Sequence, residues 1–399
     1  MSINRKKIAI VHVLYPPKAL GGATRVVVDE IDTITTKYGD DFEVVVFAAD
    51  IERQPAYQLD VYPYHNYRVY SVSCTATALS NWHHKDDRVA EIFEQFLEFE
   101  NPDLIHFHCV QILTASILEI AKKKGIPYFV SVHDAWWISD YQFLYDKAGK
   151  IYSDGHPDPF AKIELPPGIG LEQSLTRKAY LKRRLNDAVS VLPVSETYKK
   201  IYEKNGINNL MTVTNGISSK IDWLRKDTSS TEKLICGHVG GISNHKGFWI
   251  FKEAVSELKS DKIEVIVVDH TKNGSYSLKT RWGSTLVNII GHVDQKDIAK
   301  LYGQIDVLFA PSTAPESYGL VSREAAACGC WVVASDVGAI GEDINDESGF
   351  RISPTKDSIL AILKKLEHDV QKYKEPASPA SPRYSEQQTA ELVKIFRSI

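Results

Sequence analysis

Short apolar segments alternate with longer amphipathic segments along the whole chain, and this alternation predicts an α/β protein. In the first half, the apolar segments are rich in β-branched residues, as strands buried on both faces usually are. They predict strands at 7–13, 42–48, 67–72, 104–108, 128–132, 188–193 and 210–214. Apolar residues at helical spacing predict helices between some of these strands, at 22–38, 85–100 and 112–124. The pattern indicates a doubly wound parallel sheet.

The alternation restarts after a polar stretch at 218–232, which predicts a linker followed by a second parallel sheet. The predicted strands of this second half are 234–239, 264–269, 287–290, 307–310 and 331–334. Two helices are predicted near the end, at 356–374 and 385–398. The proline-serine segment 375–382 between them cannot be helical, so we expect an extended connector there.

Composition narrows the class of protein only slightly. The 399 residues are 43% hydrophobic and 25% charged, as in ordinary globular proteins of two or three domains. The formal net charge of −4 argues against nucleic acid as a partner. No apolar run approaches the ~18 residues of a membrane span. Five scattered cysteines, an odd number, favour reduced thiols and a cytoplasmic location.

The segment Pro315–Gly329 contains the most specific chemical pattern in the chain. Its two glutamates, Glu316 and Glu324, flank a loop that is predicted to become a helix at about Gly319. Backbone N–H groups at a helix N-terminus favour an anion such as a phosphate. Glu324 is expected about two turns into that helix. A helix N-terminus with two carboxylates suits a phosphate ligand that also carries hydroxyl-rich groups, as nucleotide-sugars do.

This Glu-x7-Glu segment, followed by Val-Val-Ala-Ser-Asp-Val-Gly at 332–338, resembles the retaining glycosyltransferases of family 4, which have the GT-B fold. The resemblance implies two Rossmann-like doubly wound parallel-sheet domains that face an interdomain cleft. The acceptor-side domain is expected at 1–217 and the nucleotide-sugar donor domain at 233–384. The C-terminal helix at 385–399 is expected to return to the first domain. The implied enzyme is a hexosyltransferase that moves a sugar from a nucleotide-diphosphate donor to a hydroxyl acceptor.

The resemblance assigns most donor contacts to the second domain. Glu316 is expected to face the sugar hydroxyls, Glu324 the ribose hydroxyls and Lys246 the diphosphate. The segment around His292 resembles the part of the family that meets the nucleotide base. The other donor-binding residues implied by the resemblance are Gly21, Gly22, Gly240, Gly241, Tyr318, Gly319 and Leu320.

One position departs from the family pattern. Family members carry an arginine five residues before the lysine, and this arginine helps to hold the diphosphate, but Gly241 stands there in this chain. Two substitutes are open. Another cation takes over, with His245, Arg323 and Arg25 as the nearest candidates, or the backbone amides at 240–241 do so.

His133 follows the fifth predicted strand and matches the family's histidine that lies near the reacting carbon. We therefore group it with Glu316 and Lys246 as catalytic residues. The residues after it, Asp134, Trp136 and Trp137, are assigned to acceptor binding, although simple packing accounts equally well for the two tryptophans. His106 and His108 at the end of the fourth strand also resemble a family pattern, and for them a structural role is favoured.

The sequence also suggests how the reaction would proceed. No Asp-x-Asp pair follows a strand, so neither a metal ion nor another cofactor is expected. Lys246 and helix amides would stabilise the leaving diphosphate. The front-face mechanism proposed for the family lets the leaving phosphate take the acceptor's proton, so no general base is required.

The sequence indicates only the broad class of the acceptor. We expect a saccharide or a lipid-linked acceptor, used in cell-surface polysaccharide or glycoconjugate synthesis. The basic helical stretch 175–185 allows peripheral contact with the inner membrane surface, although a solvated helix face is favoured. Two other functions stay open. A nucleotide-sugar epimerase would lack the Glu-x7-Glu segment, whereas an inactive nucleotide-sugar-binding partner is supported only by the missing arginine.

Overall fold

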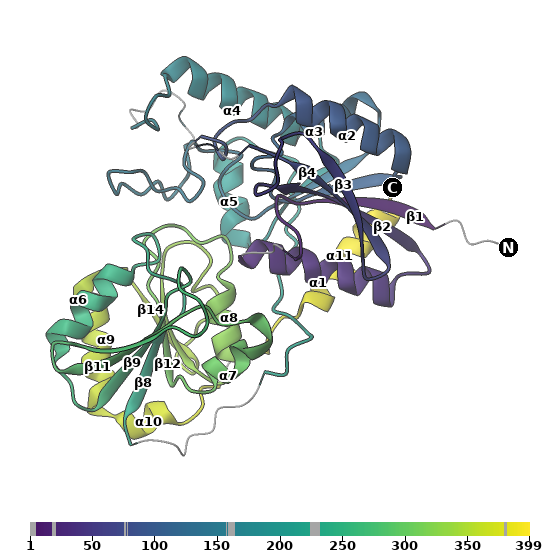
Figure 1. Ribbon diagram of the computed structural model, residues 1–399. Coiled ribbons are helices and arrows are strands. Elements are labelled where there is room, and N and C mark those ends of the chain that lie inside the picture. Colours follow the sequence, from purple (N-terminus) through teal and green to yellow (C-terminus); the bar gives the residue numbers. More distant parts are fainter. Residues whose placement is uncertain are drawn as a thin grey trace. The chain divides into compact units, whose positions relative to one another are not determined.

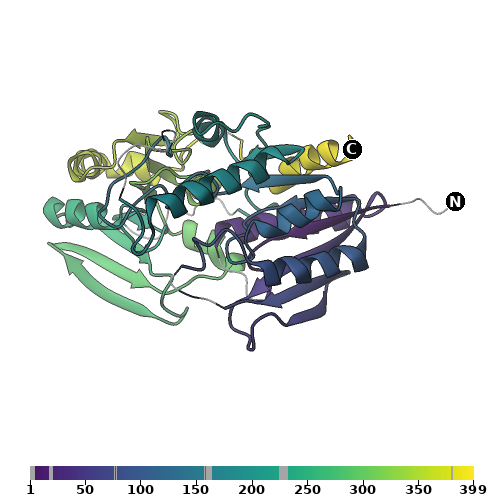
Figure 2. The same ribbon diagram turned by 90° about the horizontal axis from the view of Figure 1, so that it is seen from above.

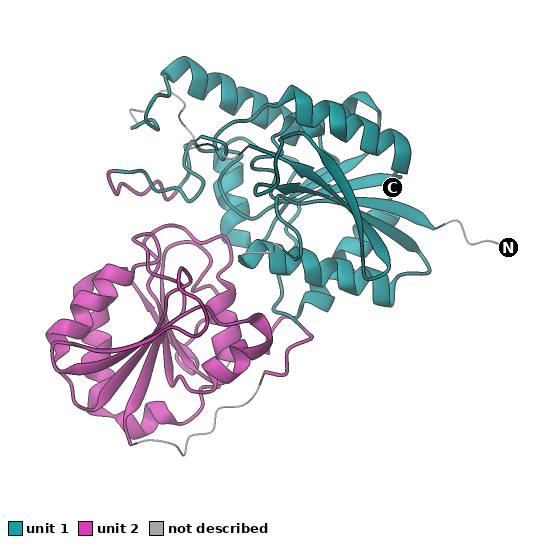
Figure 3. Cartoon of the chain, viewed as in Figure 1, with its two compact units in different colours: residues 1–147, 154–218, 384–399 teal, residues 148–153, 219–383 magenta. Residues whose placement is uncertain are grey.

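The computed structural model describes residues 5–17, 21–75, 77, 79–156, 158, 164–223, 232–378 and 381–399. The chain divides into two compact units, which have different colours in Figure 3. The first unit comprises residues 1–147, 154–218 and 384–399, and the second comprises 148–153 and 219–383. Part of the predicted linker, 224–231, and residues 379–380 of the predicted connector lie outside the described residues.

The first unit is built on strands β1 (Lys6–Val11), β2 (Phe42–Asp50), β3 (Leu59–Tyr64), β4 (Tyr67–Ser73), β5 (Leu104–Phe107), β6 (Tyr128–Val132) and β7 (Ser190–Pro193). Its helices are α1 (Gly22–Lys37), α2 (Asp87–Glu100), α3 (Ser116–Lys123), α4 (Leu171–Asn186), α5 (Glu196–Lys204) and α11 (Ser385–Arg397). The strands form one sheet in the order β3-β4-β2-β1-β5-β6-β7. Every neighbouring pair in it is parallel except β3–β4.

Helices cover both faces of this sheet (Figure 1). On one face, Ile8 of β1 belongs to a buried cluster that includes Phe396 of α11. On the other face, the ring of Phe107 in β5 lies 6.0 Å from that of Phe93 in α2. Because successive side chains of a strand point to opposite faces, His106 of β5 lies on the face of α11, with its ring 5.3 Å from that of Phe396.

The second unit is built on strands β8 (Leu234–His238), β9 (Ile263–Val268), β10 (Ser277–Trp282), β11 (Thr285–Ile290), β12 (Val307–Ala310), β13 (Trp331–Ser335) and β14 (Gly349–Ile352). Its helices are α6 (Phe248–Leu258), α7 (Ile298–Tyr302), α8 (Leu320–Ala327), α9 (Lys356–His368) and α10 (Val370–Lys374), with a 3-10 turn at Gln295–Asp297. The sheet order is β10-β11-β9-β8-β12-β13-β14, and only the β10–β11 pair is antiparallel.

This second sheet is also a layer between helices (Figure 1). Phe251 of α6 and Leu363 of α9 share one buried cluster with Val267 of β9. Leu301 of α7 and Ala325 of α8 belong to the cluster on the opposite face. The β10–β11 hairpin is the green pair of strands at the edge of the sheet in Figure 2.

The structure confirms the two doubly wound sheets, but three strands were missed by the sequence prediction. These strands, β3, β10 and β14, all lie at sheet edges. They contain exposed positions instead of a continuous apolar run, because an edge strand is covered less completely than a central one. β3 even contains Pro63, which an edge strand tolerates.

Three further predictions need correction. The segment 210–214 is not a strand, since only Leu210 makes a β-bridge, to Val191. The helix predicted at 356–374 is divided at Asp369, whose backbone is not helical and whose carboxylate caps α10. The helix predicted at 112–124 begins only at Ser116, because Ile112 and Thr114 have positive φ angles.

Two other expectations concern the state of the cysteines and the presence of membrane-spanning helices. All five cysteines have free thiols and are buried. Within the described ranges, none of the helices combines the length and apolar character needed to span a bilayer.

The strand order of each sheet reverses beside its first strand. In the first unit the reversal lies between β1 and β5, and in the second between β8 and β12. Ligands of open α/β sheets bind at such switch points, beyond the carboxyl ends of the strands. In the second unit, the loops after β8 and β12 carry Lys246 and Glu316. In the first unit, His12 follows β1 directly and His108 follows β5 directly.

Candidate active site

The switch point of the second unit brings Lys246 and Glu316 together. Lys246 Nζ lies 2.5 Å from Glu316 Oε1, and the hydroxyl of Ser312 donates a 2.7 Å hydrogen bond to the same oxygen. The sequence predicted both residues for the donor site, and the fold joins them across 70 positions of the chain. Such a group presents a cation, a carboxylate and a hydroxyl at one point.

A close approach of two loops places Lys246. The backbone carbonyl of His245 accepts hydrogen bonds from the N–H groups of Thr313 (2.9 Å) and Ala314 (3.4 Å). Gly247 has a φ of 71°, and a Cβ atom there would lie 2.0 Å from the carbonyl oxygen of Pro311. The glycine after the lysine is therefore required by the packing of these loops.

Gly338 fixes Glu316 in a similar way. Residues 316 and 338 form a parallel β-bridge, and the N–H of Ala339 donates a 2.8 Å hydrogen bond to the carbonyl of Glu316. Gly338 has a φ of 74°, and a Cβ atom there would lie 2.3 Å from the backbone nitrogen of Glu316. Gly338 thus allows its segment to pair closely with the backbone of Glu316, and this pairing holds Glu316 in place.

The charges at this point follow from their surroundings. Burial raises the pKa of a carboxyl group, but the Lys246 ammonium and the Ser312 hydroxyl outweigh it and hold the pKa of Glu316 below its usual value. Burial, helped by the neighbouring Lys246, lowers the pKa of His245. A neutral His245 adds no positive charge, so the Lys246 ammonium is the cation that faces the carboxylate.

Glu324 is the fifth residue of α8, little more than one turn into the helix, rather than the two turns expected. It is buried. Tyr302 Oη donates a 3.1 Å hydrogen bond to Glu324 Oε2, and Gln295 Nε2 donates a 3.3 Å one to Oε1. The sequence missed both partners, which lie on the neighbouring α7 and the turn before it.

The N-terminus of α8 is formed by Gly319, and Leu320 is its first residue. As a glycine, Gly319 has no side chain to cap this end of the helix. The Tyr318 ring is buried, with the guanidinium of Arg323 stacked 3.8 Å from its centroid. Arg323 also pairs with Asp343 at 2.7 Å. Arg323 therefore supports this loop, which gives it a structural role distinct from that of the family's missing arginine.

The position of that arginine, Gly241, is buried and has a φ of 91°. A Cβ atom there would lie 3.1 Å from Cδ2 of His270, whose Nε2 is 2.9 Å from the carbonyl oxygen of Val239. The imidazole of His270 thus covers the glycine from which the arginine side chain would extend. His292 is exposed, with its ring 5.9 Å from that of His270. Gly240 and Gly241 are both in the loop after β8.

In the first unit, Gly21 and Gly22 begin α1. Gly21 is the N-cap with a φ of 91°, and as a glycine it has no side chain to cap this end of the helix. His133 follows β6 and is partly exposed. Its Nε2 lies 3.0 Å from Nδ1 of His108, and the two rings are stacked. Burial, followed by the influence of His108 and other histidines, lowers the pKa of His133 well below its usual value, so its imidazole is neutral.

The three residues assigned to acceptor binding are buried. Trp136 is 1% exposed and Trp137 3%, so neither ring offers a face to solvent. The Asp134 carboxylate accepts hydrogen bonds from the side-chain amides of Gln111 (2.9 Å) and Gln142 (2.7 Å) and from the Trp136 N–H. The packing interpretation, which the sequence left open for the two tryptophans, accounts for their burial.

Arg177 contributes part of the positive charge of the basic stretch 175–185, but it has a structural role. It is buried and donates hydrogen bonds to the carbonyls of Trp82, Trp136 and Ser139. Arg184 is buried as well. Within 175–185, the cations on the exposed side of α4 are Lys182 and Arg183. The helix face is therefore less basic than its sequence suggests, which favours the solvated-face interpretation.

A cluster that the sequence did not connect lies behind His133. Glu30 of α1 is buried beside His106 and His108, and these three side chains could hold a metal ion. A signal was present in the sequence, since a glutamate at a buried helical position needs a partner. The partner's identity depended on the tertiary structure.

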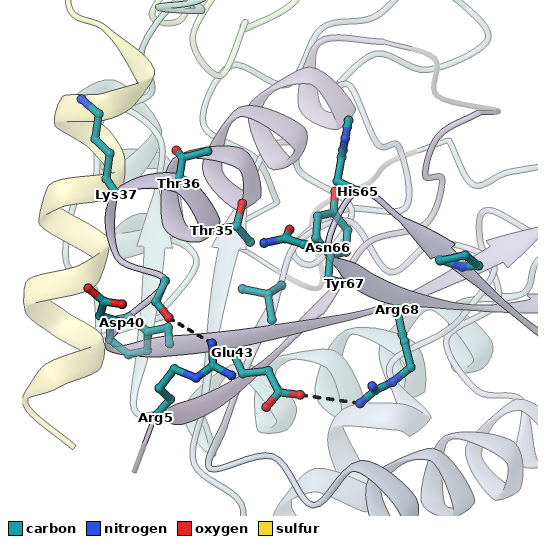
Figure 4. Close-up of a pocket in the computed structure, with 14 residues that line it drawn as sticks. Arg5, Thr35, Thr36, Lys37, Asp40, Glu43, His65, Asn66, Tyr67 and Arg68 are labelled. Atoms are coloured by element: carbon teal, nitrogen blue, oxygen red, sulfur yellow. Dashed lines mark hydrogen bonds and ion pairs between the residues drawn. The ribbon is translucent and has the colours of Figure 1, made fainter. Parts of the chain in front are cut away.

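A hollow of about 730 Å³ lies at the other end of the first sheet, by the amino ends of β1, β2 and β4 (Figure 4). Several of its charged groups pair with nearby groups. Arg68 lies 3.6 Å from Glu43, and Arg5 donates a hydrogen bond to the Gly39 carbonyl. Because ligands of doubly wound sheets bind at the carboxyl ends of strands, we do not assign this hollow to the candidate site.

Two protein families match the chain. Residues 20–220, about half of the chain, match the family described as Glycosyltransferase Family 4. Residues 219–381 match the family described as Glycosyl transferases group 1.

Individual relatives agree with these families. An uncharacterized glycosyltransferase of Methanocaldococcus jannaschii is 25% identical over 370 residues, covering 89% of this chain and 87% of the relative. A phosphatidyl-myo-inositol mannosyltransferase of Propionibacterium freudenreichii subsp. shermanii is 30% identical over 128 residues, or 30% of this chain. That match spans about a third of the mannosyltransferase, 32% of its length.

Solved structures show the same architecture. Sucrose-phosphate synthase from Thermosynechococcus elongatus has a TM-score of 0.67 at 16% identity, covering 99% of both chains. The Anabaena protein HepE, in complex with UDP and glucose, has a TM-score of 0.68 at 18% identity, covering 99% of this chain and all of the other. At these identities the likeness concerns the fold.

Proposed function

Because the chain belongs to glycosyltransferase family 4 and has the GT-B fold, we propose that it transfers a hexose-type sugar from a nucleoside-diphosphate donor to a hydroxyl group, with retention of anomeric configuration. The observation that carries this proposal is the group formed by Lys246, Glu316 and Ser312 at the switch point of the second unit. HepE, which shares the fold, has been solved with UDP-glucose.

Each residue of this group has a role that suits its chemistry. Lys246 neutralises the diphosphate, which competes with Glu316 for the ammonium when the donor binds. The uncapped N-terminus of α8 adds backbone N–H groups for the same anion. Glu316 then accepts hydrogen bonds from the sugar hydroxyls. Glu324, held by Tyr302 and Gln295, does the same for the ribose.

The donor's own phosphate completes the proposed chemistry. As the bond from the anomeric carbon to the leaving phosphate oxygen breaks, the acceptor oxygen forms a new bond to that carbon on the same face, and the leaving phosphate takes the proton of the acceptor hydroxyl. The neutral His133 contacts the sugar near the reacting carbon without adding a charge. Since Lys246 and the helix amides supply the counter-charge, adding Mg²⁺ or Mn²⁺ is expected to leave the rate unchanged.

Two relatives bear on the acceptor. Their names describe a phosphatidyl-myo-inositol mannosyltransferase and a D-inositol 3-phosphate glycosyltransferase. Both names contain inositol, a polyol, in one case carried by a phosphatidyl group and in the other as its 3-phosphate. We place the acceptor of this chain in the same broad class of saccharide or lipid-linked hydroxyl compounds, used in glycoconjugate or polysaccharide synthesis. Five free thiols suit a reducing, cytoplasmic location for this reaction.

Donor binding tests the proposal. We would measure the thermal shift caused by UDP, GDP, ADP and their glucose conjugates in the wild type, Lys246→Ala and Glu324→Ala. Each variant loses a charge-assisted hydrogen bond of about 1.5–3 kcal/mol, so its affinity for the nucleotide that binds is expected to fall by at least about 10-fold.

Lys233→Ala is a matched control. Lys233 pairs with Glu264 at 2.8 Å, at the amino ends of β8 and β9, and its loss is expected to leave nucleotide affinity unchanged. Unchanged affinity in Lys246→Ala and Glu324→Ala, with both variants folded, would show that the donor site is elsewhere. Turnover of the donor to an epimer without any acceptor would instead favour an epimerase.

A further inference from the structure

The switch point of the first unit holds a buried cluster of three potential metal ligands: Glu30 of α1, His106 of β5 and His108 just after β5. One ligand atom from each of these side chains lies within 4.8 Å of the others. All three side chains are almost fully buried. They lie beside the carboxyl end of β1, at the place in this sheet that corresponds to Lys246 and Glu316 in the other sheet.

The histidines are held in the manner of metal ligands. His106 Nε2 lies 2.8 Å from Ser131 Oγ, and His108 Nδ1 lies 3.0 Å from His133 Nε2. These contacts orient the rings so that the remaining nitrogens face Glu30. Ligating histidines characteristically have their second nitrogen fixed by such a partner.

One of the two atom pairs that face each other has the spacing of ligands. His108 Nε2 lies 3.4 Å from Glu30 Oε2. This pair does not have hydrogen-bond geometry, and both of its atoms are buried without a hydrogen-bond partner. His106 Nδ1 makes a 2.7 Å hydrogen bond with Glu30 Oε1, and this contact would lengthen when an ion takes the place of the shared proton. Two ligand atoms of a tetrahedral zinc ion are separated by about 3.3 Å, given metal–ligand bonds of about 2.0–2.1 Å.

The charge of the cluster also calls for a cation. The Glu30 carboxylate is almost fully buried beside His106 and His108. An ionised carboxylate in the core must be paired, and either a proton on the cluster or a metal ion supplies the positive charge.

We propose that Glu30, His106 and His108 bind a divalent transition-metal ion, with Zn²⁺ as the expected ion. Two imidazole nitrogens and one carboxylate oxygen are a common zinc ligand set. His12 is the nearest further donor. Its Nε2 lies 3.0 Å from Thr24 Oγ1, and its Nδ1 is buried without a hydrogen-bond partner. Its ring lies 6.1 Å from that of His108.

The bound ion would act on the structure of the first unit. It would join α1 to β5 beneath α11, whose Phe396 packs against His106. Through the contact between His108 and His133, it would also fix the orientation of His133, which makes His108 a positioning residue. The proposal does not depend on the donor site of the second unit.

Zinc content tests this proposal directly. The purified full-length protein would be dialysed against a chelator, incubated with Zn²⁺ and desalted, and its zinc measured by elemental mass spectrometry. The expected result is one tightly held Zn²⁺ per chain and a higher unfolding temperature. Co²⁺ in its place is expected to give the visible absorption of a four-coordinate site.

The variants Glu30→Gln and His108→Gln are expected to lose Zn²⁺ affinity by at least about 100-fold, and Ser131→Ala, which removes only the partner of His106, by about 10–100-fold. His238→Gln is the matched control. It removes a buried histidine of the second unit that also has an unpartnered nitrogen, and it is expected to retain the zinc.

Several results would overturn the proposal. A wild-type protein that retains no stoichiometric Zn²⁺ would show that a proton, not a metal, balances Glu30. Zinc retained by Glu30→Gln and His108→Gln would place the ion elsewhere. If those two variants fail to fold, Ser131→Ala decides, because an affinity equal to that of the wild type would contradict the assignment.

Discussion

At the scale of single residues, Glu316 combines the position proposed for sugar binding with an environment that keeps it charged. Its carboxylate is partly buried, and Lys246 and Ser312 both contact the same oxygen. When the diphosphate takes over the Lys246 ammonium, this ionised carboxylate can accept hydrogen bonds from a sugar. Its negative charge then stabilises a transition state in which the sugar gains positive charge.

Glu316→Ala is therefore expected to lower kcat by at least about 100-fold, or about 2.7 kcal/mol of activation free energy, with a smaller change in KM. Glu316→Gln keeps the size and is expected to retain more activity. Initial rates with the natural donor check this, and the product's anomeric proton, read by NMR at early times, checks retention. A change confined to KM would mean that Glu316 contributes to substrate binding and not to the chemical step.

His238 gives a prediction on pH and stability. It lies beneath the loop of Lys246, and burial lowers its pKa to about 4, against about 6.5 in an unfolded chain. As the pH falls below about 6.5, the unfolded chain takes up a proton first, so the free energy of unfolding decreases progressively down to about pH 4.

His238→Gln removes this contribution. The difference between urea midpoints at pH 7 and pH 5 is expected to be smaller in His238→Gln than in the wild type. The exposed His368→Gln in α9 is the control and should match the wild type. An equal pH effect in all three proteins would refute the assignment.

At the scale of elements, glycines decide how closely the loops of the second unit approach one another. Lys246 and Glu316 meet because Gly247 lets its loop contact the Pro311 carbonyl and Gly338 lets its loop pair with residue 316. The loops therefore pack as one unit, in which backbone contacts between the loops fix the positions of the Lys246 and Glu316 side chains.

Gly338→Ala is expected to reduce the free energy of unfolding by about 3 kcal/mol, because it adds a steric clash to the cost of a positive φ. Gly329→Ala, in the same unit with a φ of 80° and 3.2 Å to Pro376 Cβ, is expected to cost only about 1–2 kcal/mol. Urea unfolding measures both. Equal losses would show that the contact with Glu316 does not matter for stability.

At the scale of the whole molecule, two sheets with the same strand order place polar residues at corresponding switch points. The last helix belongs to the first unit although it follows the second in sequence. It buries Leu392, Val393 and Phe396 in the core against α1. The core of the first unit thus includes side chains from the C-terminal helix, α11.

Phe396→Ala is expected to lower the free energy of unfolding by about 3–5 kcal/mol, since it opens a cavity between α11 and the sheet. Lys394→Ala, on the exposed side of the same helix, is expected to change it by less than about 0.5 kcal/mol. Denaturant unfolding compares the two. A small loss in Phe396→Ala would mean that α11 contributes little to the stability of the first unit.

The sequence by itself determined the two doubly wound sheets, the helix at 320–327 and the residue types of the proposed donor site. Central strands and amphipathic helices have local periodicity, and the Glu-x7-Glu pattern lies within one loop and helix, so these features need no knowledge of distant contacts. Edge strands such as β3 and β10 lacked that signal, because solvent replaces one of their neighbours.

The tertiary structure alone decided which distant residues meet. Glu30 and His106 are 76 positions apart, and they become neighbours because β5 pairs with β1 beneath α1. The same is true of His270 over Gly241 and of Trp136 against Arg177. Residue type indicates what a side chain can do, but strand pairing and helix packing determine which partner it finds, and those depend on the whole fold.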